Sequence, residues 1–424
     1  MERETSLQQN SGADLNIEKV KPGIRHRVIR RVKGQPDGIL LIVITVLLAI
    51  GALMIFSSSY AYAEYRFGNS YHFVVKHLPY LGIGLSIMLV VMLFDYKSYR
   101  KLVNFAFLIA LALLCMVLVF GFNASGATRW IEIGPIQLQP SEIMKLALVL
   151  FLANYLSLNV TACRDVSAKT IAKANMERPK KLWQRILGVA SFEQLWNEFI
   201  FPMAVIGTVC VITVLEKHLS ATIILFCIGF CVMFLGKTPL VPLFGMVGIG
   251  GAAAATFALT MGYTSDRIAI WLDPYKDPLG DGWQSIHSFM AIGSGGIFGV
   301  GFCNSTQKHM YLPEPYNDYI FSVFCEEFGF IGAIGLLILF GVFIWRGFVI
   351  SRKAPDSFSR LTAAGITCKI GIQVIFNIFV VTGLFPPTGI SLPFISYGGT
   401  ALVLLLAECG ILLGISRYSY AEKL

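Results

Sequence analysis

The chain has 424 residues, of which 55% are hydrophobic and only 14% are charged, whereas a soluble domain carries about 25% charged residues. This composition excludes a soluble globular protein. Apolar runs of about 20 residues, the length that crosses a hydrocarbon core of ~30 Å, indicate a polytopic α-helical membrane protein. The six histidines show no metal-ligand spacing, so the sequence predicts no metal site.

Residues 1–37 form a polar, basic head, and the first apolar run begins near Gly38. This order favours a retained first span over a cleaved signal peptide. The predicted fold class is an all-α membrane protein of about ten transmembrane helices in a membrane domain over 38–418, followed by a short tail, 419–424. The spans are predicted near 38–57, 78–94, 102–121, 141–158, 199–215, 220–236, 240–262, 319–345, 362–383 and 397–416.

The distribution of Lys and Arg between the loops predicts the orientation. With the N-terminus inside, 25 of these residues fall in inside segments and 7 in outside segments. The positive-inside rule therefore predicts that both termini are cytoplasmic. The net charge of +9 is then a topology signal that needs no nucleic-acid partner. The long loop 263–318, between spans seven and eight, is predicted to be extracytoplasmic, away from ATP.

Span four opens on a polar group in which Ser141 can cap the helix and Glu142 lies in the first turn. Glu142 and Lys145 are three residues apart and can form an ion pair. One interpretation is a capped helix with a local salt bridge. The other is a charged wall of a hydrated cavity, with Arg129 and Trp130 just upstream supplying a cation and an interfacial aromatic ring.

Span nine carries Lys369, Gln373 and Asn377 at four-residue spacing, so the three side chains share one helix face. Such a stripe predicts a polar interior, although a single member could serve as helix-packing contact. Glu326 and Glu327 in span eight are adjacent and point about 100° apart, so at most one of them should face a given cavity.

The outer loop 263–318 is rich in Pro, Gly and carboxylates. Asp273, Asp277 and Asp281 recur at four-residue spacing, but the intervening prolines exclude one continuous helix. A carboxylate held beside an apolar surface can act as a base, and the alternative is an ordinary solvated loop. The glycine cluster over 293–299 lacks the dinucleotide-binding spacing and is predicted to allow close packing of short helices.

Several segments resemble the SEDS family (shape, elongation, division and sporulation). The resemblance covers nearly the whole chain from about residue 38. The segments that carry it are Arg129-Trp130, Gln139-Pro140-Ser141-Glu142, Asp277-Pro278-Leu279-Gly280, Leu312-Pro313-Glu314, Asp318-Tyr319-Ile320-Phe321, Glu326-Glu327-Phe328-Gly329, Pro386-Pro387 and Phe394-Ile395-Ser396-Tyr397-Gly398-Gly399-Thr400-Ala401.

The resemblance implies a peptidoglycan glycosyltransferase that polymerises lipid II at the outer face of a bacterial cytoplasmic membrane. It implies a class B penicillin-binding protein as partner, alongside other division or elongation membrane proteins. The family's essential loop aspartate corresponds to Asp277, which is expected to act as general base in an inverting transfer. The expected cavity-lining residues are Arg129, Trp130, Ser141, Glu142, Lys145, Glu314, Asp318, Lys369, Gln373, Asn377, Ser396 and Tyr397. No cofactor is required, and a divalent cation bridging the diphosphate would be compatible with this chemistry.

One stretch departs from the family pattern. Where many members carry Pro-Asp-x-Gly-Thr between spans five and six, this chain has Lys217-His218-Leu219-Ser220-Ala221. The role of that turn's carboxylate is therefore in doubt. The segment 312–318 resembles the division and sporulation branch (FtsW and SpoVE) more than the elongation branch (RodA).

Two other classes of function compete with an enzyme. A lipid II flippase would use the charges of spans four and nine to line a headgroup path, but no inverted repeat or matched pair of broken helices is evident. A scaffold would only position the penicillin-binding protein, and it would have no need of a polar stripe at membrane depth.

Overall fold

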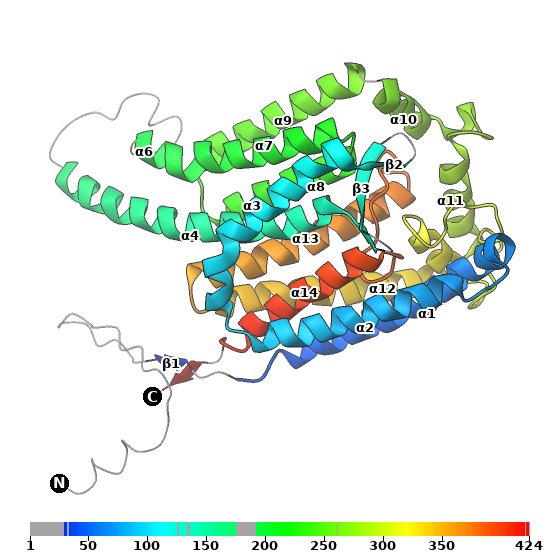
Figure 1. Cartoon of the computed structure of the whole chain (residues 1–424), viewed down its shortest axis with the longest axis horizontal. Helices are drawn as coiled ribbons and strands as arrows, with labels where there is room; N and C mark the ends of the chain where they lie inside the picture. The colour runs from blue at the N-terminus through cyan, green and yellow to red at the C-terminus, as the bar shows by residue number, and fades with distance from the viewer. Residues whose placement is uncertain are drawn as a thin grey trace, which may run out of the picture.

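The structure is a computed structural model that describes residues 29–31, 34–124, 127–133, 136–174, 192–260, 262–419 and 421–423. Figure 1 shows one bundle of long helices that run roughly side by side. Helices α10 (Gly262–Leu272) and α11 (Trp283–Ser294) lie at one end of it. A two-stranded ribbon of β1 (Ile29–Arg31) and β5 (Ala421–Lys423) lies at the other end. The large loop and the two ends of the described chain are thus at opposite ends of the bundle.

The helix boundaries agree with the predicted spans to within a few residues at most ends. The bundle helices are α1 (Gly38–Phe67), α2 (His72–Leu93), α3 (Tyr96–Phe120), α4 (Pro140–Ala174), α6 (Phe192–Leu195) continued through a π-helical turn (Trp196–Ile200) into α7 (Phe201–Leu215), α8 (Leu219–Leu235), α9 (Leu240–Thr260), α12 (Ile320–Lys353), α13 (Ser357–Val381) and α14 (Gly399–Ser416). The largest differences are the C-terminal ends of α1 and α4, which both extend well beyond the predicted apolar run.

In the described part of the chain, eight helices are long and apolar enough to cross a membrane, and two shorter apolar helices, α8 and α9, accompany them. The multi-pass helical class is therefore confirmed, and the count of ten stays a prediction. Most of the head 1–37 falls outside the described residues, and the tail 419–424 is described at 419 and 421–423.

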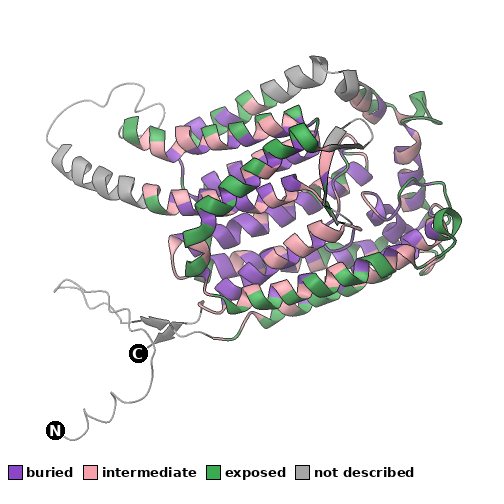
Figure 2. Ribbon diagram, in the orientation of Figure 1, coloured by how far each residue is buried: buried purple, intermediate pink, exposed green. Residues whose placement is uncertain are grey.

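Helices α13 and α14 form the centre of the bundle. Two thirds (67%) of the apolar window of each is buried, against 17% for α2. Helix α13 packs against α12, α4, α8 and α14, and Figure 2 shows the exposed faces of α2 and α3 turned outward. Polar residues on α13 are thereby placed in the protein interior, while the outward faces of α2 and α3 are apolar, as lipid contact requires.

Local sequence explains where several helices begin. Asp37 caps α1 by accepting from the amide of Leu40, and Asp95 caps α3 in the same way. Asp356 and Ser359 form a capping box at the start of α13. These caps satisfy amide groups that have no partner within the helix.

A small antiparallel sheet between α3 and α4 is a feature that the all-α prediction missed. Its strands are β2 (Phe122–Ala124), β3 (Ala127–Ile133) and β4 (Ile136–Leu138), paired in the order β2-β3-β4. Strand β3 is rich in β-branched and aromatic residues, which favour strands, but it is too short to stand out from a loop in the sequence. It carries Arg129 and Trp130.

Helix α12 is broken at Gly329, which has φ 66° and ψ −166°. The loop before α12 forms hydrogen bonds with the backbone groups that the break leaves without helical partners. The amides of Val300 and Gly301 donate to the carbonyls of Glu326 and Glu327, and the amide of Phe330 donates to Gly296. At membrane depth an unpaired backbone group is costly, so this exchange makes the break tolerable.

Glycine is required at this junction. A Cβ on Gly329 would lie 2.3 Å from the amide nitrogen of Gly299, and a Cβ on Gly295 would lie 2.1 Å from the carbonyl oxygen of Cys325. The predicted use of the glycine cluster for close packing is correct, but the partner is the broken turn of α12 and not a set of short surface helices.

Candidate functional site

The first turns of α4 carry a buried ion pair. Lys145 Nζ lies 2.5 Å from Glu142 Oε1, which confirms the predicted pairing. Ser141, however, does not cap the helix. The helix already begins at Pro140, and the buried hydroxyl of Ser141 has no hydrogen-bond partner. Pro140 has no backbone N–H, so the first helical position needs no capping acceptor. The hydroxyl of Ser141 is therefore available to bind another group.

The polar stripe of α13 is buried as predicted, but its three members do different things. Lys369 Nζ pairs with Glu408 of α14 at 2.7 Å. Asn377 donates from Nδ2 to the backbone carbonyls of Asp318 and Ile390. Gln373 lines a cavity together with Glu142 and Lys369.

This inner cavity is small. It has a volume of about 30 Å³, which is room for a water molecule and not for a sugar. Ser396 and Tyr397 line it as predicted. The remaining lining residues are Ser391, Leu392, Pro393, Phe394, Gly398, Ala401, Leu402 and Leu405.

Several buried polar atoms in the described residues have no hydrogen-bond partner, among them Arg129 Nε, Ser141 Oγ, Glu216 Oε1, His218 Nδ1, Asn377 Oδ1 and Thr388 Oγ1. His218 interacts electrostatically with Glu142, Lys145 and Arg129, Glu216 interacts with Arg129, and Ser220 of the same turn donates to the carbonyl of Thr388. Each such atom costs about 1–3 kcal/mol unless something bonds to it. We call this group the polar chamber. Its atoms suit a hydrated, polar ligand.

The turn between α7 and α8, where the sequence departs from the family pattern, forms one wall of the polar chamber. Arg129 donates from Nη2 to the carbonyl of Lys217. Burial raises the pKa of Glu216 to about 8, with Arg129 opposing the shift. Burial, followed by the charges of Arg129 and Lys145, lowers the pKa of His218 to about 3. Both side chains are therefore uncharged at neutral pH.

Asp318 is a half-buried carboxylate on which the charges of two arginines act. Burial and the nearby charge of Glu314 raise its pKa to about 6, while Arg129 and Arg267 oppose the shift. Arg267, on α10, donates from Nη1 to the carbonyl of Pro387 at 2.7 Å. A Cβ on Gly389 would lie 3.1 Å from Asp318 Oδ2, so the carboxylate lies against the same 387–389 segment. At neutral pH the charges of two guanidinium groups therefore act on one carboxylate here.

Asp277 lies apart from these charges. Its side chain is exposed, and its two carboxylate oxygens accept from the amides of Gly280 and Asp281 at 3.1 Å each. It does not line the inner cavity. The expectation of a carboxylate held beside an apolar surface is therefore wrong for the structure as it stands. Two hydrogen bonds from backbone amides hold the Asp277 carboxylate in place. They leave lone pairs on its oxygens that can accept from a further donor.

A second, larger hollow lies beside Asp277. It has a volume of about 440 Å³ and is lined by Leu279, Gly280, Asp281, Trp283, Gln284 and Pro313. We call it the outer hollow. Glu314 does not line either cavity. It is exposed at a turn with φ 44° and accepts from Asn317 Nδ2, and its role at the substrate site stays a prediction.

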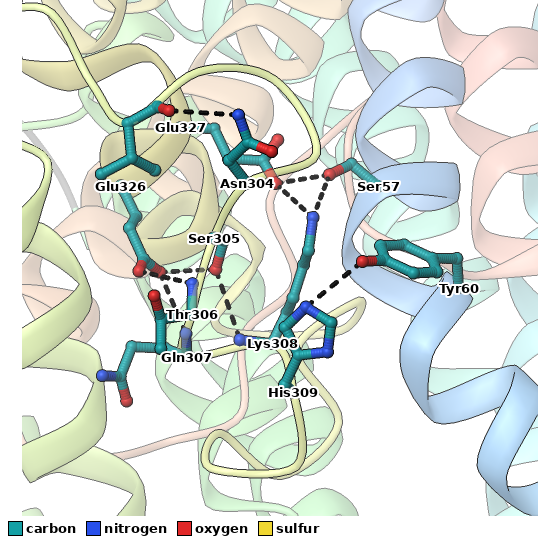
Figure 3. A network of polar contacts seen from close by, with 11 residues as sticks. Ser57, Tyr60, Asn304, Ser305, Thr306, Gln307, Lys308, His309, Glu326 and Glu327 are labelled. Carbon is teal, nitrogen blue, oxygen red and sulfur yellow. Dashed lines mark hydrogen bonds and ion pairs between the residues drawn. The ribbon is translucent and has the colours of Figure 1, made fainter.

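A buried network anchors the loop that ends at α12 (Figure 3). Lys308 is fully buried and pairs with Glu327 Oε1 at 2.7 Å. Ser57 of α1 contacts both partners, and the Tyr60 ring lies 4.8 Å from Lys308 Nζ. This ion pair joins the loop to both α1 and α12.

Glu326 holds the same loop from the other side. It accepts from Ser305 Oγ and from the amides of Thr306 and Gln307. As predicted, the two adjacent glutamates face different partners. We call the contacts of Lys308, Glu326 and Glu327 the loop clamp.

The loop clamp is connected to the Asp277 segment through α11. His287 Nδ1 lies 2.7 Å from Gln307 Oε1, and Trp283 Nε1 donates to the carbonyl of Tyr311 at 2.5 Å. The turn before α11 closes on Asp277, whose carbonyl accepts from the amide of Gly282. The loop clamp thus sets the position of α11, and α11 sets the position of Asp277.

No group of three or more His, Cys, Asp or Glu converges within the residues that the structure describes. The divalent cation that the resemblance allows has no ready-made protein ligand set there. A cation in this region would depend on ligands from the substrate.

A sequence profile of the FtsW, RodA and SpoVE family of cell cycle proteins matches residues 38–421. The chain belongs to this family. Among curated relatives, stage V sporulation protein E of Bacillus subtilis is 37% identical over 91% of this chain and 98% of its own length. A probable peptidoglycan glycosyltransferase FtsW of Coxiella burnetii is 33% identical over 87% of this chain and 93% of its own.

Solved structures support the family assignment. A structure described as a peptidoglycan synthase complex that coordinates polymerization and crosslinking matches with a TM-score of 0.66 and 27% identity, over 91% of this chain and 98% of that one. The rod shape determining protein RodA of Thermus thermophilus matches with a TM-score of 0.61 over 91% of this chain and 98% of that one. At 24% identity, the RodA likeness shows the shared fold.

Some residues of this FtsW/RodA/SpoVE-family site escaped the sequence analysis. In the sequence, Arg267 and Lys308 are two of the seven outside cations, and no role is predicted for Glu408. Nothing in the neighbouring sequence distinguishes the fully buried Lys308 from a solvated loop lysine. Glu216 and His218 were noticed only as a departure from the family pattern.

Proposed function

We propose that this protein is a peptidoglycan glycosyltransferase that polymerises lipid II into glycan strands. The observation that carries the proposal is family membership across residues 38–421, with relatives that are named peptidoglycan glycosyltransferases. The buried charges support it, because a reaction that expels a diphosphate needs cations fixed near the leaving group. Its donor is already activated, so the reaction needs no ATP.

In this proposal Asp277 takes the proton from the acceptor 4-hydroxyl. The oxygen attacks C1 of the donor sugar, and the lipid diphosphate leaves with inversion at C1. Arg129 and Arg267 would be the cations that bind the diphosphate, because the charges of both act in the same region, at the Asp318 carboxylate. Lys145 and Lys369 each pair with a carboxylate. They would contribute positive charge deeper in the bundle, behind the diphosphate.

The inner cavity is too small for a headgroup, so substrate entry requires the segments around the polar chamber to separate. The unpartnered atoms of Ser141 and His218 make that separation less costly, because no hydrogen bond within the protein is lost there. The lipid tails would lie in grooves between the apolar helices.

The cellular setting is also part of the proposal. Both termini would lie in the cytoplasm, and the large loop would face outward from a bacterial cytoplasmic membrane, as the Lys and Arg distribution predicts. The partner would be a class B penicillin-binding protein that crosslinks the new strand. The solved peptidoglycan synthase complex to which this chain is similar supports that choice. The likeness to FtsW and stage V sporulation protein E favours a role in division or sporulation.

The test is polymer formation from lipid II by protein purified in detergent, with the penicillin-binding protein supplied. We expect chains from the wild type and none from Asp277→Asn, with partner binding unchanged. In the same assay Glu142→Ala and Lys369→Ala should impair synthesis more than Glu132→Ala, which removes an exposed carboxylate on β3.

The alternatives predict other results. Detergent abolishes membrane sidedness, so a flippase would give no chains from wild type or variant. A scaffold would support synthesis by its partner equally well with and without Asp277. Normal glycan yield from Asp277→Asn would remove Asp277 as the base.

A further inference from the structure

Four of the described cysteines form one row across three helices. Cys210 of α7 interacts electrostatically with Cys227 of α8, and Cys227 does so with Cys231, one turn further along α8. The thiol of Cys231 is hydrogen-bonded to the thiol of Cys368 on α13. The row therefore ends in two contacting thiols that belong to different helices. The proposed transfer reaction uses none of these four side chains.

The backbones of α8 and α13 approach closely beside the thiol pair. The two helices pack against each other. Gly365 lies one turn before Cys368, and a Cβ placed on it would lie 3.0 Å from the side chain of Val232, the residue after Cys231. A disulfide needs its two β-carbons about 3.5–4.5 Å apart. Contacting sulfurs on closely packed helices can meet this requirement with little movement of the backbone.

The thiol pair lies within the apolar part of the bundle. Cys368 is the twelfth of the 25 residues of α13, and Cys231 is the thirteenth of the 17 residues of α8. Both thiols are partly exposed. Phe234, one turn after Cys231, is 48% exposed, so the surface beside the pair is apolar. A reagent that reaches these sulfurs would therefore come from the acyl chains of the membrane and not from water.

We propose that Cys231 and Cys368 form an oxidation site at which a lipid-soluble quinone produces a disulfide that fastens α8 to α13. In this reaction the two S–H bonds break and one S–S bond forms. The quinone accepts the two electrons and the two protons and leaves as the hydroquinone. The inference goes beyond the proposed glycosyltransferase function, and only its effect on polymerisation rests on that function.

The disulfide would join two helices that carry parts of the candidate site. Lys369, the residue after Cys368, lines the inner cavity. Ser220, in the first turn of α8, donates to the carbonyl of Thr388, whose side chain belongs to the polar chamber. Substrate entry requires the segments around the polar chamber to separate. A covalent bond between α8 and α13 would restrain this movement, and reduction of the disulfide would restore it.

The test uses the full-length protein in detergent, oxidised with tetramethylbenzoquinone, whose blocked ring positions prevent addition of thiols. Free thiols are then alkylated, and the disulfide is mapped by mass spectrometry. We expect a bond between Cys231 and Cys368. Polymerisation of lipid II should fall about 5-fold or more, because the opening movement is restrained, and a reductant should restore it. The crosslink should also raise the melting temperature.

Matched variants separate this site from general oxidation. Cys115→Ala removes an exposed thiol on α3 and should respond to the quinone as the wild type does. Cys231→Ala should keep its activity and melting temperature after oxidation, and Cys368→Ala provides the same comparison if Cys231→Ala fails to fold. Oxidised glutathione is charged and excluded from the apolar interior, so it should leave the pair reduced.

Three results would overturn the inference. The first is the absence of the Cys231–Cys368 bond after treatment with the quinone. The second is an equal loss of polymerisation in the wild type and in Cys231→Ala. The third is a disulfide that forms and leaves polymerisation unchanged. A reduced wild type that makes no polymer would instead refute the proposed function, while disulfide mapping and the melting temperature would still decide whether the oxidation site exists.

Discussion

The loop clamp makes a sharp prediction about Lys308. Replacing Lys308 with Met would leave the Glu327 carboxyl group buried without its cation, and the Ser57 hydroxyl would remain as its hydrogen-bond partner. Breaking a buried ion pair from one side costs about 3–5 kcal/mol, and the lost contact with the Tyr60 ring adds to this. The melting temperature in detergent should fall on the order of 5–10 °C.

Two further variants distinguish the cost of an unpaired buried carboxyl group from a nonspecific effect of substitution in this loop. Lys276→Met removes an exposed lysine of the same loop and should change stability by less than about 0.5 kcal/mol. The double variant Lys308→Met, Glu327→Leu removes both charges and should recover most of the lost stability, because two matched apolar side chains replace a buried pair at little cost.

Thermal unfolding and lipid II polymerisation are measured on all four proteins. If the loop clamp positions Asp277 through α11, the single variant should lose polymerisation at temperatures well below its melting point. The reasoning is refuted if Lys308→Met melts like Lys276→Met, or if the double variant melts no higher than the single one.

Two other predictions concern the broken helix and Asp318. Gly329→Ala should lower the melting temperature by the equivalent of at least about 1–3 kcal/mol, since φ is 66° and the new Cβ would meet Gly299. The control Gly335→Ala, whose Cβ would meet no neighbouring segment within 4 Å, should be neutral or slightly stabilising. Equal effects of the two substitutions would contradict the argument. Because burial raises the pKa of Asp318 from 3.8 to about 6, the folded protein holds this proton more tightly, so the stability it contributes is present below pH 4 and is lost as the pH rises to 6. Asp318→Asn should remove up to about 3 kcal/mol of that pH dependence in thermal unfolding, and identical slopes for the two proteins would disprove the assignment.

Much of the membrane architecture can be predicted from the sequence, because the length of each apolar run and the Lys and Arg content of each loop are local properties of the chain. The span boundaries and the Glu142–Lys145 pair depend on residues that are close in the chain. The polar stripe of α13 could be placed on one helix face, but its partners could not be named. Glu408 lies 39 residues from Lys369, and no local pattern joins them.

The outer loop shows where local reasoning fails. The Lys308–Ser57 contact spans 251 residues, and it depends on the break at Gly329 that lets the loop enter the bundle. The proposed base, Asp277, could be singled out by resemblance, yet its exposure depends on how a turn folds around its carboxylate. The carboxylate spacing in the sequence carries no information about that turn.

The charge distribution of the site bears on where the diphosphate of a substrate can bind. Burial of Glu216 and His218 in uncharged form keeps the polar chamber from cancelling Arg129. The outer hollow, by contrast, is lined by one carboxylate, that of Asp281, and by no cation. A diphosphate would therefore bind more favourably at the polar chamber than at the outer hollow. In the proposed reaction the base and the cations act on one displacement, so Asp277 and the polar chamber must come together around the two substrates before transfer.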